Sequence, residues 1–148
     1  MRRHSRPALA AALASAFLAA PALAQEGDPV AGEKAFRKCA ACHSIEPGAP
    51  SKIGPNLHDV VGRVTGTFEG FKYSDAMTKA GQEGHVWTVE ELNIYLENPK
   101  TAMPGNKMTF VGVKKPEERA DLIAYLVSLN PAGARRQRPP RPTDPSPA

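Results

Sequence analysis

The sequence predicts a small all-α domain of three main helices joined by long loops, on three observations. Three segments combine a helix-start signal with apolar residues at helical spacing. The alternation of apolar and polar residues that marks a strand is nearly absent. Glycine, proline and asparagine recur from Pro47 to Gly70, which indicates a long loop region.

The first helix is predicted to run from Asp28 toward Cys42. Asp28 suits the N-cap, and Pro29 suits the first helical position because its missing N–H would have no partner there. Gly32 within this segment weakens a helix by about 1 kcal/mol unless close packing requires the missing side chain. The residues expected to face inward are Val30, Phe36 and Cys39.

The second and third helices have equally clear signals. Thr88 and Glu91 form a capping box, and the helix they open should stop before Asn98-Pro99. Pro116 opens the last helix, where the acids that follow it complement the helix dipole. The apolar stripe of this helix, which ends before Asn130-Pro131, consists of Leu122, Ile123, Leu126 and Leu129.

The end of the first helix carries the sequence Cys39-Ala40-Ala41-Cys42-His43. This C-x-x-C-H spacing is typical of covalent attachment of a c-type haem. The two thiols can add to the vinyl groups of the porphyrin while the adjacent imidazole reaches the iron from one face. Other interpretations of the two cysteines are weaker. A thioredoxin-like pair should follow a buried strand, a zinc site needs two further ligands, and a disulfide across two residues would be strained.

A bound haem also agrees with the size of the core. Three helices and long loops give about a hundred residues little apolar material to bury. A porphyrin would supply the missing apolar surface. We therefore expect the loops to wrap around one covalently bound haem, and the haem-free chain to be largely unfolded.

Both ends of the chain differ in composition from the domain between them. Residues 1–24 have a basic start, an apolar stretch and an A-x-A site at Ala22-Leu23-Ala24, which predicts a cleaved export signal. Residues 131–148 hold six prolines and four arginines and are predicted to be disordered. The domain is therefore expected to span residues 25–130.

The net charge of +4 is misleading for this domain. Three of the 19 basic residues lie in the leader and four in the tail, and one of the 15 acidic residues lies in the tail. The domain keeps 12 basic and 14 acidic residues, a net charge of −2. Nucleic-acid binding is not expected, because no basic stripe with interleaved aromatic residues is present.

The residues alone leave the second iron ligand open. The domain contains three methionines, Met77, Met103 and Met108, and any of them can simply fill a gap in a core. His58 or His85 would instead give a bis-histidine site. Met108 stands in a turn-rich loop that could wrap around the edge of a flat cofactor.

A series of motifs in order resembles the class I cytochromes c, close to the mitochondrial form and its bacterial relatives. The resemblance covers nearly all of residues 32–129. Its motifs, in chain order, are Cys39 to His43, Gly54 to His58, Gly62-Arg63, Gly70 to Tyr73, Trp87, Tyr95 to Lys100, Pro104 to Met108 and Glu118 to Tyr125.

This resemblance implies the ligand set and its surroundings. Haem c, one per chain, would be attached through Cys39 and Cys42 and ligated by His43 and Met108, with Met103 excluded. The Pro55 carbonyl would orient the His43 ring, Tyr95 would sit near the Met108 sulfur, and Phe36 and Tyr125 would join the first and last helices. The residues expected near a haem propionate are Arg63, Tyr73 and Trp87.

Three departures from the mitochondrial pattern stand out. Met77 occupies the place of a polar asparagine near the haem pocket. Asn106 replaces a threonine of the methionine loop, which leaves the propionate contact of that residue in doubt. The stretch from Ala76 to Trp87 is about three residues longer.

The resemblance implies an electron carrier rather than an enzyme, because His/Met ligation favours the ferrous state and leaves no open iron site. The export signal predicted in residues 1–24 places this carrier in the periplasm. Expected partners of this monomer are a cytochrome bc complex as donor and a terminal oxidase or photosynthetic reaction centre as acceptor. Alternatives are a haem-bearing module of a larger redox complex, or a haem peroxidase or ligand sensor. The lysines expected to ring the haem edge and steer docking are Lys38, Lys52, Lys100 and Lys107.

Overall fold

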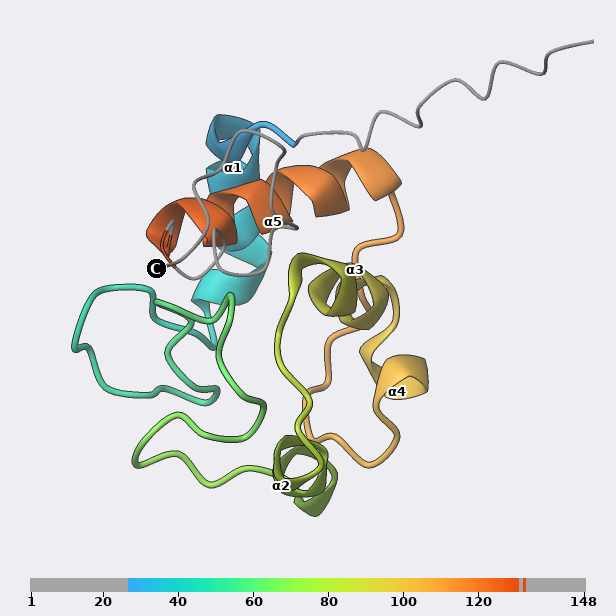
Figure 1. Cartoon of the computed structure of the whole chain (residues 1–148). Helices are drawn as coiled ribbons and strands as arrows, with labels where there is room; N and C mark the ends of the chain where they lie inside the picture. The colour runs from blue at the N-terminus through green and yellow to red at the C-terminus, as the bar shows by residue number, and fades with distance from the viewer. Residues whose placement is uncertain (1–26, 131, 133–148) are drawn as a thin grey trace, which may run out of the picture.

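The computed structural model describes residues 27–130 and residue 132. The predicted leader and, apart from Ala132, the predicted tail lie outside these residues. The described part contains five helices and no strand, with one isolated antiparallel bridge between Val64 and Val86. The helices are α1 (Pro29–Ala40), α2 (Asp75–Gln82), α3 (Val89–Glu97), α4 (Pro99–Ala102) and α5 (Pro116–Leu129), connected by long loops (Figure 1). None of these helices is long and apolar enough to cross a bilayer.

Helix α1 begins as predicted and packs across α5 near the two ends of the described chain. The Asp28 carboxylate accepts from the Val30 N–H at 2.8 Å, and the Asp28 N–H donates to Asp121 of α5 at 2.7 Å. Phe36 is buried, and its ring lies 5.7 Å from that of Tyr125, which confirms the predicted helix contact. Val30 is 62 % exposed, so its predicted inward position is wrong.

Gly32 explains how closely these two helices approach each other. A Cβ at this position would lie 1.9 Å from the carbonyl oxygen of Asp121. No side chain fits in that space, so the backbone of α1 can meet the backbone of α5 only at a glycine. The close packing that would justify a glycine within a helix is therefore present.

Helices α3 and α5 agree with their sequence signals. The Thr88 hydroxyl accepts from the Glu91 N–H at 3.1 Å, and α3 stops at Glu97, just before Asn98-Pro99. Helix α5 buries Leu122, Ile123 and Leu126. It also buries Arg119, which donates to Asn93 of α3 at 2.7 Å and to the Val113 carbonyl at 2.8 Å. Arg119 thus ties α5 to α3 with a charge that the apolar pattern could not predict.

Two helices were not predicted. Helix α2 has no fully buried residue, and its short apolar face consists of the partly buried Ala76, Met77 and Ala80, which were not interpreted as a helix from the sequence. The Ser74 side chain caps it by accepting from the Met77 N–H at 3.3 Å. Helix α4 has only four residues. Pro99, which stops α3, also serves as the first helical residue of α4, since proline needs no N–H partner at that position.

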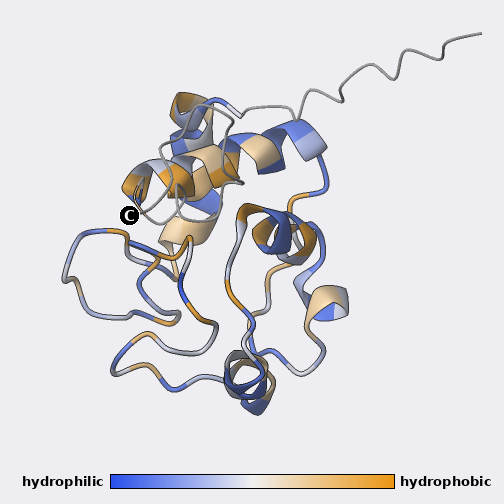
Figure 2. Ribbon diagram, in the orientation of Figure 1, coloured by the Kyte–Doolittle hydropathy of each residue, from blue (hydrophilic) through white to orange (hydrophobic). Residues whose placement is uncertain are grey.

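The loops carry much of the core. Val60, Val61, Trp87, Met103 and Val113 are buried although they lie outside the helices. Figure 2 shows apolar residues scattered along the loops as well as on the helices. Backbone hydrogen bonds of 2.9 Å from Trp87 to Arg63 and from Thr65 to His85 hold two loop segments together. The His85 ring is also 2.6 Å from the Thr65 hydroxyl and 3.1 Å from the Glu91 carboxylate of α3.

Candidate haem site

The attachment turn continues the last turn of α1. The N–H groups of Cys42 and His43 both donate to the Cys39 carbonyl, at 3.0 and 2.9 Å. Neither Cys39 nor Cys42 is in a disulfide, and both are half-buried. Burial raises the pKa of the Cys39 thiol to about 11, although the positive charge of Lys38 opposes this effect. The structure therefore presents two free thiols beside an imidazole.

The His43 ring is held in one orientation. Its Nδ1 lies 2.7 Å from the Pro55 carbonyl oxygen. A carbonyl can only accept, so Nδ1 carries the hydrogen and Nε2 keeps its lone pair in the neutral ring. Burial lowers the pKa of His43, and the charge of Lys52 lowers it further, against the effect of the Pro55 hydrogen bond. The neutral ring, which is the form that binds metal, is thereby favoured.

Gly54 lets the backbone pass directly against this ring. A Cβ on Gly54 would lie 2.4 Å from the His43 Cε1 atom. The Gly54 N–H donates to the Cys42 carbonyl at 2.8 Å. The segment around Gly54 and Pro55 thus forms a cradle that holds the imidazole ring through its Nδ1.

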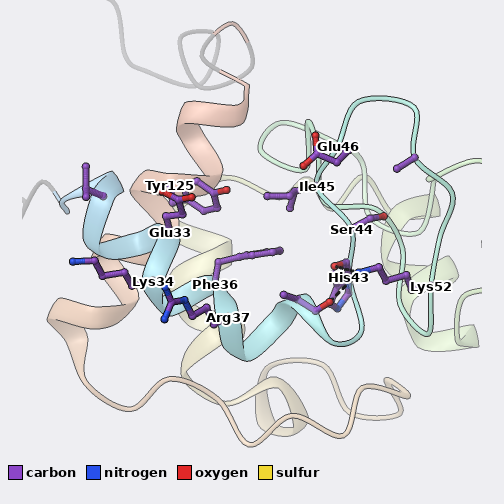
Figure 3. Close-up of a pocket in the computed structure, with 13 residues that line it drawn as sticks. Glu33, Lys34, Phe36, Arg37, His43, Ser44, Ile45, Glu46, Lys52 and Tyr125 are labelled. Atoms are coloured by element: carbon purple, nitrogen blue, oxygen red, sulfur yellow. Dashed lines mark hydrogen bonds between the residues drawn. The ribbon is translucent and has the colours of Figure 1, made fainter.

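Lys52 contributes to the same cradle from the surface. Its ammonium donates to the Ala40 carbonyl at 3.0 Å and to the His43 carbonyl at 3.4 Å. Figure 3 shows Lys52 and His43 side by side at the edge of a surface hollow of about 570 Å³. The residues lining this hollow include His43 but neither cysteine nor Met108. The hollow is therefore not the space between the two predicted iron ligands, His43 and Met108.

The opposite side of the site is formed by the loop that follows α4. Met103 is buried in the core, whereas Met108 is half-buried at the edge of the core. Leu57, Met77 and Phe110 are likewise apolar residues packed only partly against it. Apolar side chains that the described residues leave half-covered are what a bound porphyrin would complete.

Tyr95 gives an independent sign of a missing neighbour. It is 7 % exposed, and its hydroxyl is buried with no hydrogen-bond partner among the described residues. Burial raises the pKa of this phenol above its ordinary range. A buried hydroxyl without a partner is costly, so this oxygen is consistent with a neighbouring group that the polypeptide does not supply, while its predicted place near the Met108 sulfur stays a prediction. The residues present therefore fit a haem c.

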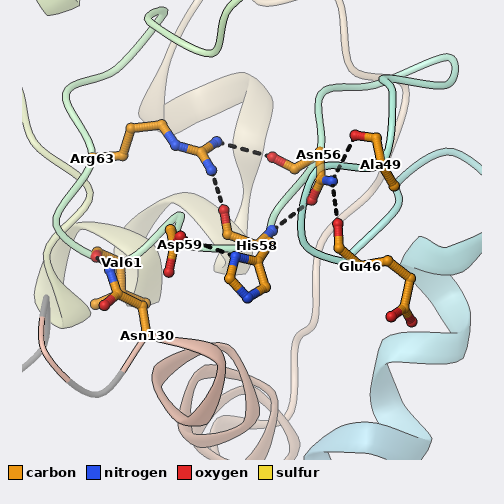
Figure 4. Close-up of polar contacts among 8 residues, drawn as sticks. All are labelled: Glu46, Ala49, Asn56, His58, Asp59, Val61, Arg63 and Asn130. Carbon is orange, nitrogen blue, oxygen red and sulfur yellow. Dashed lines mark hydrogen bonds and ion pairs between the residues drawn. The ribbon is translucent and has the colours of Figure 1, made fainter.

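The residues expected near a propionate are only partly brought together. Arg63 donates to the Asn56 carbonyl at 2.9 Å and to the His58 carbonyl (Figure 4), and it lies 5.0 Å above the Phe68 ring. Burial lowers the pKa of Arg63, while Tyr73 acts in the opposite direction through its charge and a hydrogen bond. Trp87 packs between the rings of His85 and Tyr95, at 5.0 and 4.8 Å.

The sequence pattern predicted no role for Asn56, although this residue lies in the segment from Gly54 to His58 that carries the family resemblance. This side chain is 1 % exposed and donates to the carbonyls of Glu46 and Ala49 at 2.8 and 2.9 Å (Figure 4). Its oxygen accepts from the His58 N–H at 2.7 Å. Asn56 therefore fixes the loop that carries the Pro55 carbonyl. The signal available in the sequence was a polar amide between Pro55 and Leu57.

The lysines expected around the haem edge differ in their contacts. Lys38 pairs with Glu118 of α5 at 2.5 Å, and Lys52 is bound to the two carbonyls described above. Lys100 and Lys107 are exposed. Half of the predicted docking lysines are therefore engaged within the chain itself.

The comparisons with known proteins agree with this site. The model of the family described as Cytochrome c matches residues 29–130. A cytochrome c2 of Agrobacterium tumefaciens is 52 % identical over 102 residues, covering 69 % of this chain and 92 % of that protein. A cytochrome c of Chlamydomonas reinhardtii is 56 % identical over 114 residues, covering 76 % and 95 %. The solved structure of cytochrome cH from Methylobacterium extorquens has a TM-score of 0.63 and 42 % identity, covering 69 % of this chain and 99 % of that one.

Proposed function

Because the chain belongs to the cytochrome c family, we propose that it is a periplasmic carrier of single electrons between membrane redox complexes. When bound, haem c supplies an iron that gains and loses one electron. Cys39 and Cys42 would hold the group covalently, and His43 and Met108 would ligate the iron. The observation that carries the proposal is the His43 ring, fixed by the Pro55 carbonyl beside two free thiols.

The residues of the chain then act by keeping the iron ligands in fixed positions. The Pro55 carbonyl and Gly54 keep the imidazole in one orientation, so its position need not change with the charge of the iron. Met108 would supply the second ligand to the iron, which would leave no site for oxygen or peroxide. This arrangement suits electron transfer and does not suit a peroxidase or a ligand sensor.

Docking requires brief contact with a donor and an acceptor. The exposed Lys100 and Lys107 would steer the approach of acidic partners, with association rates that fall as salt rises. Suitable partners are a cytochrome bc complex as donor and a terminal oxidase or photosynthetic reaction centre as acceptor. The export signal predicted in residues 1–24 would bring the chain to the periplasm, where we expect a monomer.

Replacement of the proposed sulfur ligand tests this assignment. Met108→Ala should abolish the weak sulfur-to-iron band of the ferric holoprotein, lower the reduction potential and let carbon monoxide bind the ferrous form. Met103→Ala is the matched control and should leave spectrum and potential nearly unaltered, because Met103 is a core residue. An unchanged spectrum in the Met108 variant would show that another group ligates the iron.

A further inference from the structure

Asn106 makes three hydrogen bonds with its side chain in the loop that carries Met108. Its Nδ2 donates to the carbonyls of Pro99 and Met103, each at 2.8 Å. Its Oδ1 accepts from the Met108 N–H at 2.9 Å. Residue Asn106 is half-buried. Its three hydrogen bonds join α4, the turn after it and the predicted sulfur ligand.

The amide group suits these three partners. A primary amide has two N–H donors and one carbonyl acceptor, and here both donors and the acceptor are used. Its orientation is fixed, because two carbonyls can only accept and a backbone N–H can only donate. The two carbonyls belong to α4 and its C-cap, where they also accept from the backbone N–H groups of Met103 and Asn106, at 3.0 and 3.2 Å.

A threonine at this position could not make the same set of contacts. A single hydroxyl has one donor hydrogen, whereas the Asn106 amide donates to two carbonyls at once. The replacement of the threonine of the mitochondrial pattern therefore adds contacts within the loop. Position 106, where the resemblance implies a propionate contact, instead holds the loop together. We call the three hydrogen bonds of the Asn106 side chain the clamp.

We propose that Asn106 is a positioning residue for Met108, a proposal that rests on Met108 being the sulfur ligand. The clamp ties the Met108 backbone to the end of α4. It disfavours loop conformations in which the side chain has left the iron. The retention of sulfur in the ferric protein thus depends on an amide that does not itself touch the iron.

Competition by an external ligand tests this proposal. Ferric holoprotein is titrated with imidazole, which displaces the methionine, while the sulfur-to-iron band is followed. Asn106→Ala should raise the apparent imidazole affinity about tenfold, which corresponds to a loss of about 1.4 kcal/mol from the hydrogen bonds. Asn106→Ser keeps one oxygen near the Met108 N–H and should give an intermediate value.

Thr109→Ala is the matched control. Thr109 is exposed on the other side of Met108, and its side chain makes no hydrogen bond among the described residues. This variant should bind imidazole as the unchanged protein does. Hydrogen exchange of the Met108 amide in the ferrous holoprotein gives a second measurement, and it should accelerate in both Asn106 variants but not in the control.

The outcomes separate this proposal from the ligand assignment. If Met108→Ala leaves the band intact, the ligand assignment fails. If that variant loses the band while Asn106→Ala and Thr109→Ala bind imidazole equally well, the ligand assignment stands and the role of Asn106 is refuted. Should Asn106→Ala yield no holoprotein, Asn106→Ser decides by the same comparison.

Discussion

The ammonium of Lys52 lies at the carboxyl end of α1, where backbone carbonyls lack partners within the helix. A positive charge at this end also interacts favourably with the helix dipole. Lys52 bonds to the carbonyls of Ala40 and His43, on both sides of Cys42. Its contacts stabilise the attachment turn, in addition to any part it takes in docking.

Removing the Lys52 ammonium should destabilise the protein more than removing the ammonium of a lysine that makes no contact. Lys52→Met should lower the free energy of unfolding of the holoprotein by about 0.5–1 kcal/mol. Its melting temperature should fall by about 2–6 °C. Lys100→Met is the control, because Lys100 is exposed and makes no side-chain hydrogen bond or ion pair in the described part of the chain. Equal melting temperatures of the two variants, measured by calorimetry, would show that the cap contributes nothing.

Sequence predicted some residue contacts and missed others for a physical reason. The contact of Phe36 with Tyr125 followed from a motif resemblance, and the structure confirms it. The bonds of Lys52 and Asn106 were not predicted, because the direction of a long or polar side chain depends on tertiary neighbours that lie many bonds away. The sequence predicts which four residues attach the haem and ligate its iron. That attachment and ligation stay predictions.

Helices α1 and α5 meet at backbone distance, and Gly32 makes this possible. A Cβ at that position would lie 2.8 Å from the Tyr125 Cβ as well as against the Asp121 carbonyl. The backbones would have to separate to relieve this overlap. The same movement would disturb the contact of Phe36 with Tyr125 and the hydrogen bond between Asp28 and Asp121.

Gly32→Ala should therefore destabilise the protein although alanine is the better helix former. We expect a loss of about 1–3 kcal/mol or more, as for overpacking in a core. Lys34→Ala, at an exposed position of the same helix, is the control and should change stability by less than about 0.5 kcal/mol. Denaturant unfolding of both holoproteins measures the difference. A Gly32 variant as stable as the Lys34 variant would mean that α1 and α5 can separate without cost.

The elements that sequence could predict are those with a cap and a buried stripe. Helices α1 and α3 have a side-chain cap and buried residues, and α5 has a starting proline and buried residues. The positions of all three agree with the predictions. Helix α2 has a cap at Ser74, but it is only eight residues long and its small apolar face is only partly buried, so it was missed. Helix α4 is one turn long, and the proline that forms its start was interpreted only as the end of α3.

At the scale of the molecule, the core of the described chain is built from loops as well as from helices. Buried loop residues such as Val61 and Val113 lie beside side chains that remain half-covered, among them Leu57 and Phe110. The Tyr95 hydroxyl has no partner among the described residues. These features indicate that the polypeptide alone does not complete its core. The all-α class and the family were predicted from sequence, and the comparisons confirm both.

A chain that cannot attach its cofactor should therefore lose cooperative folding. The double variant Cys39→Ser with Cys42→Ser should show no cooperative thermal transition by circular dichroism and much weaker helical signal than the holoprotein. The reason is that the half-covered apolar residues would face water in the absence of the porphyrin. A cooperative melt within a few degrees of the holoprotein would contradict this expectation.

The packing of the first helix against the last has a consequence for biogenesis. A polypeptide is made from its amino end, so Cys39 and Cys42 emerge well before α5 exists to cover α1. During that interval both thiols lie in an unfinished chain, where the burial that raises the pKa of Cys39 is absent. Thioether formation is thus chemically easiest while the chain is still unfolded, and the packing of the last helix against the first would follow attachment of the cofactor.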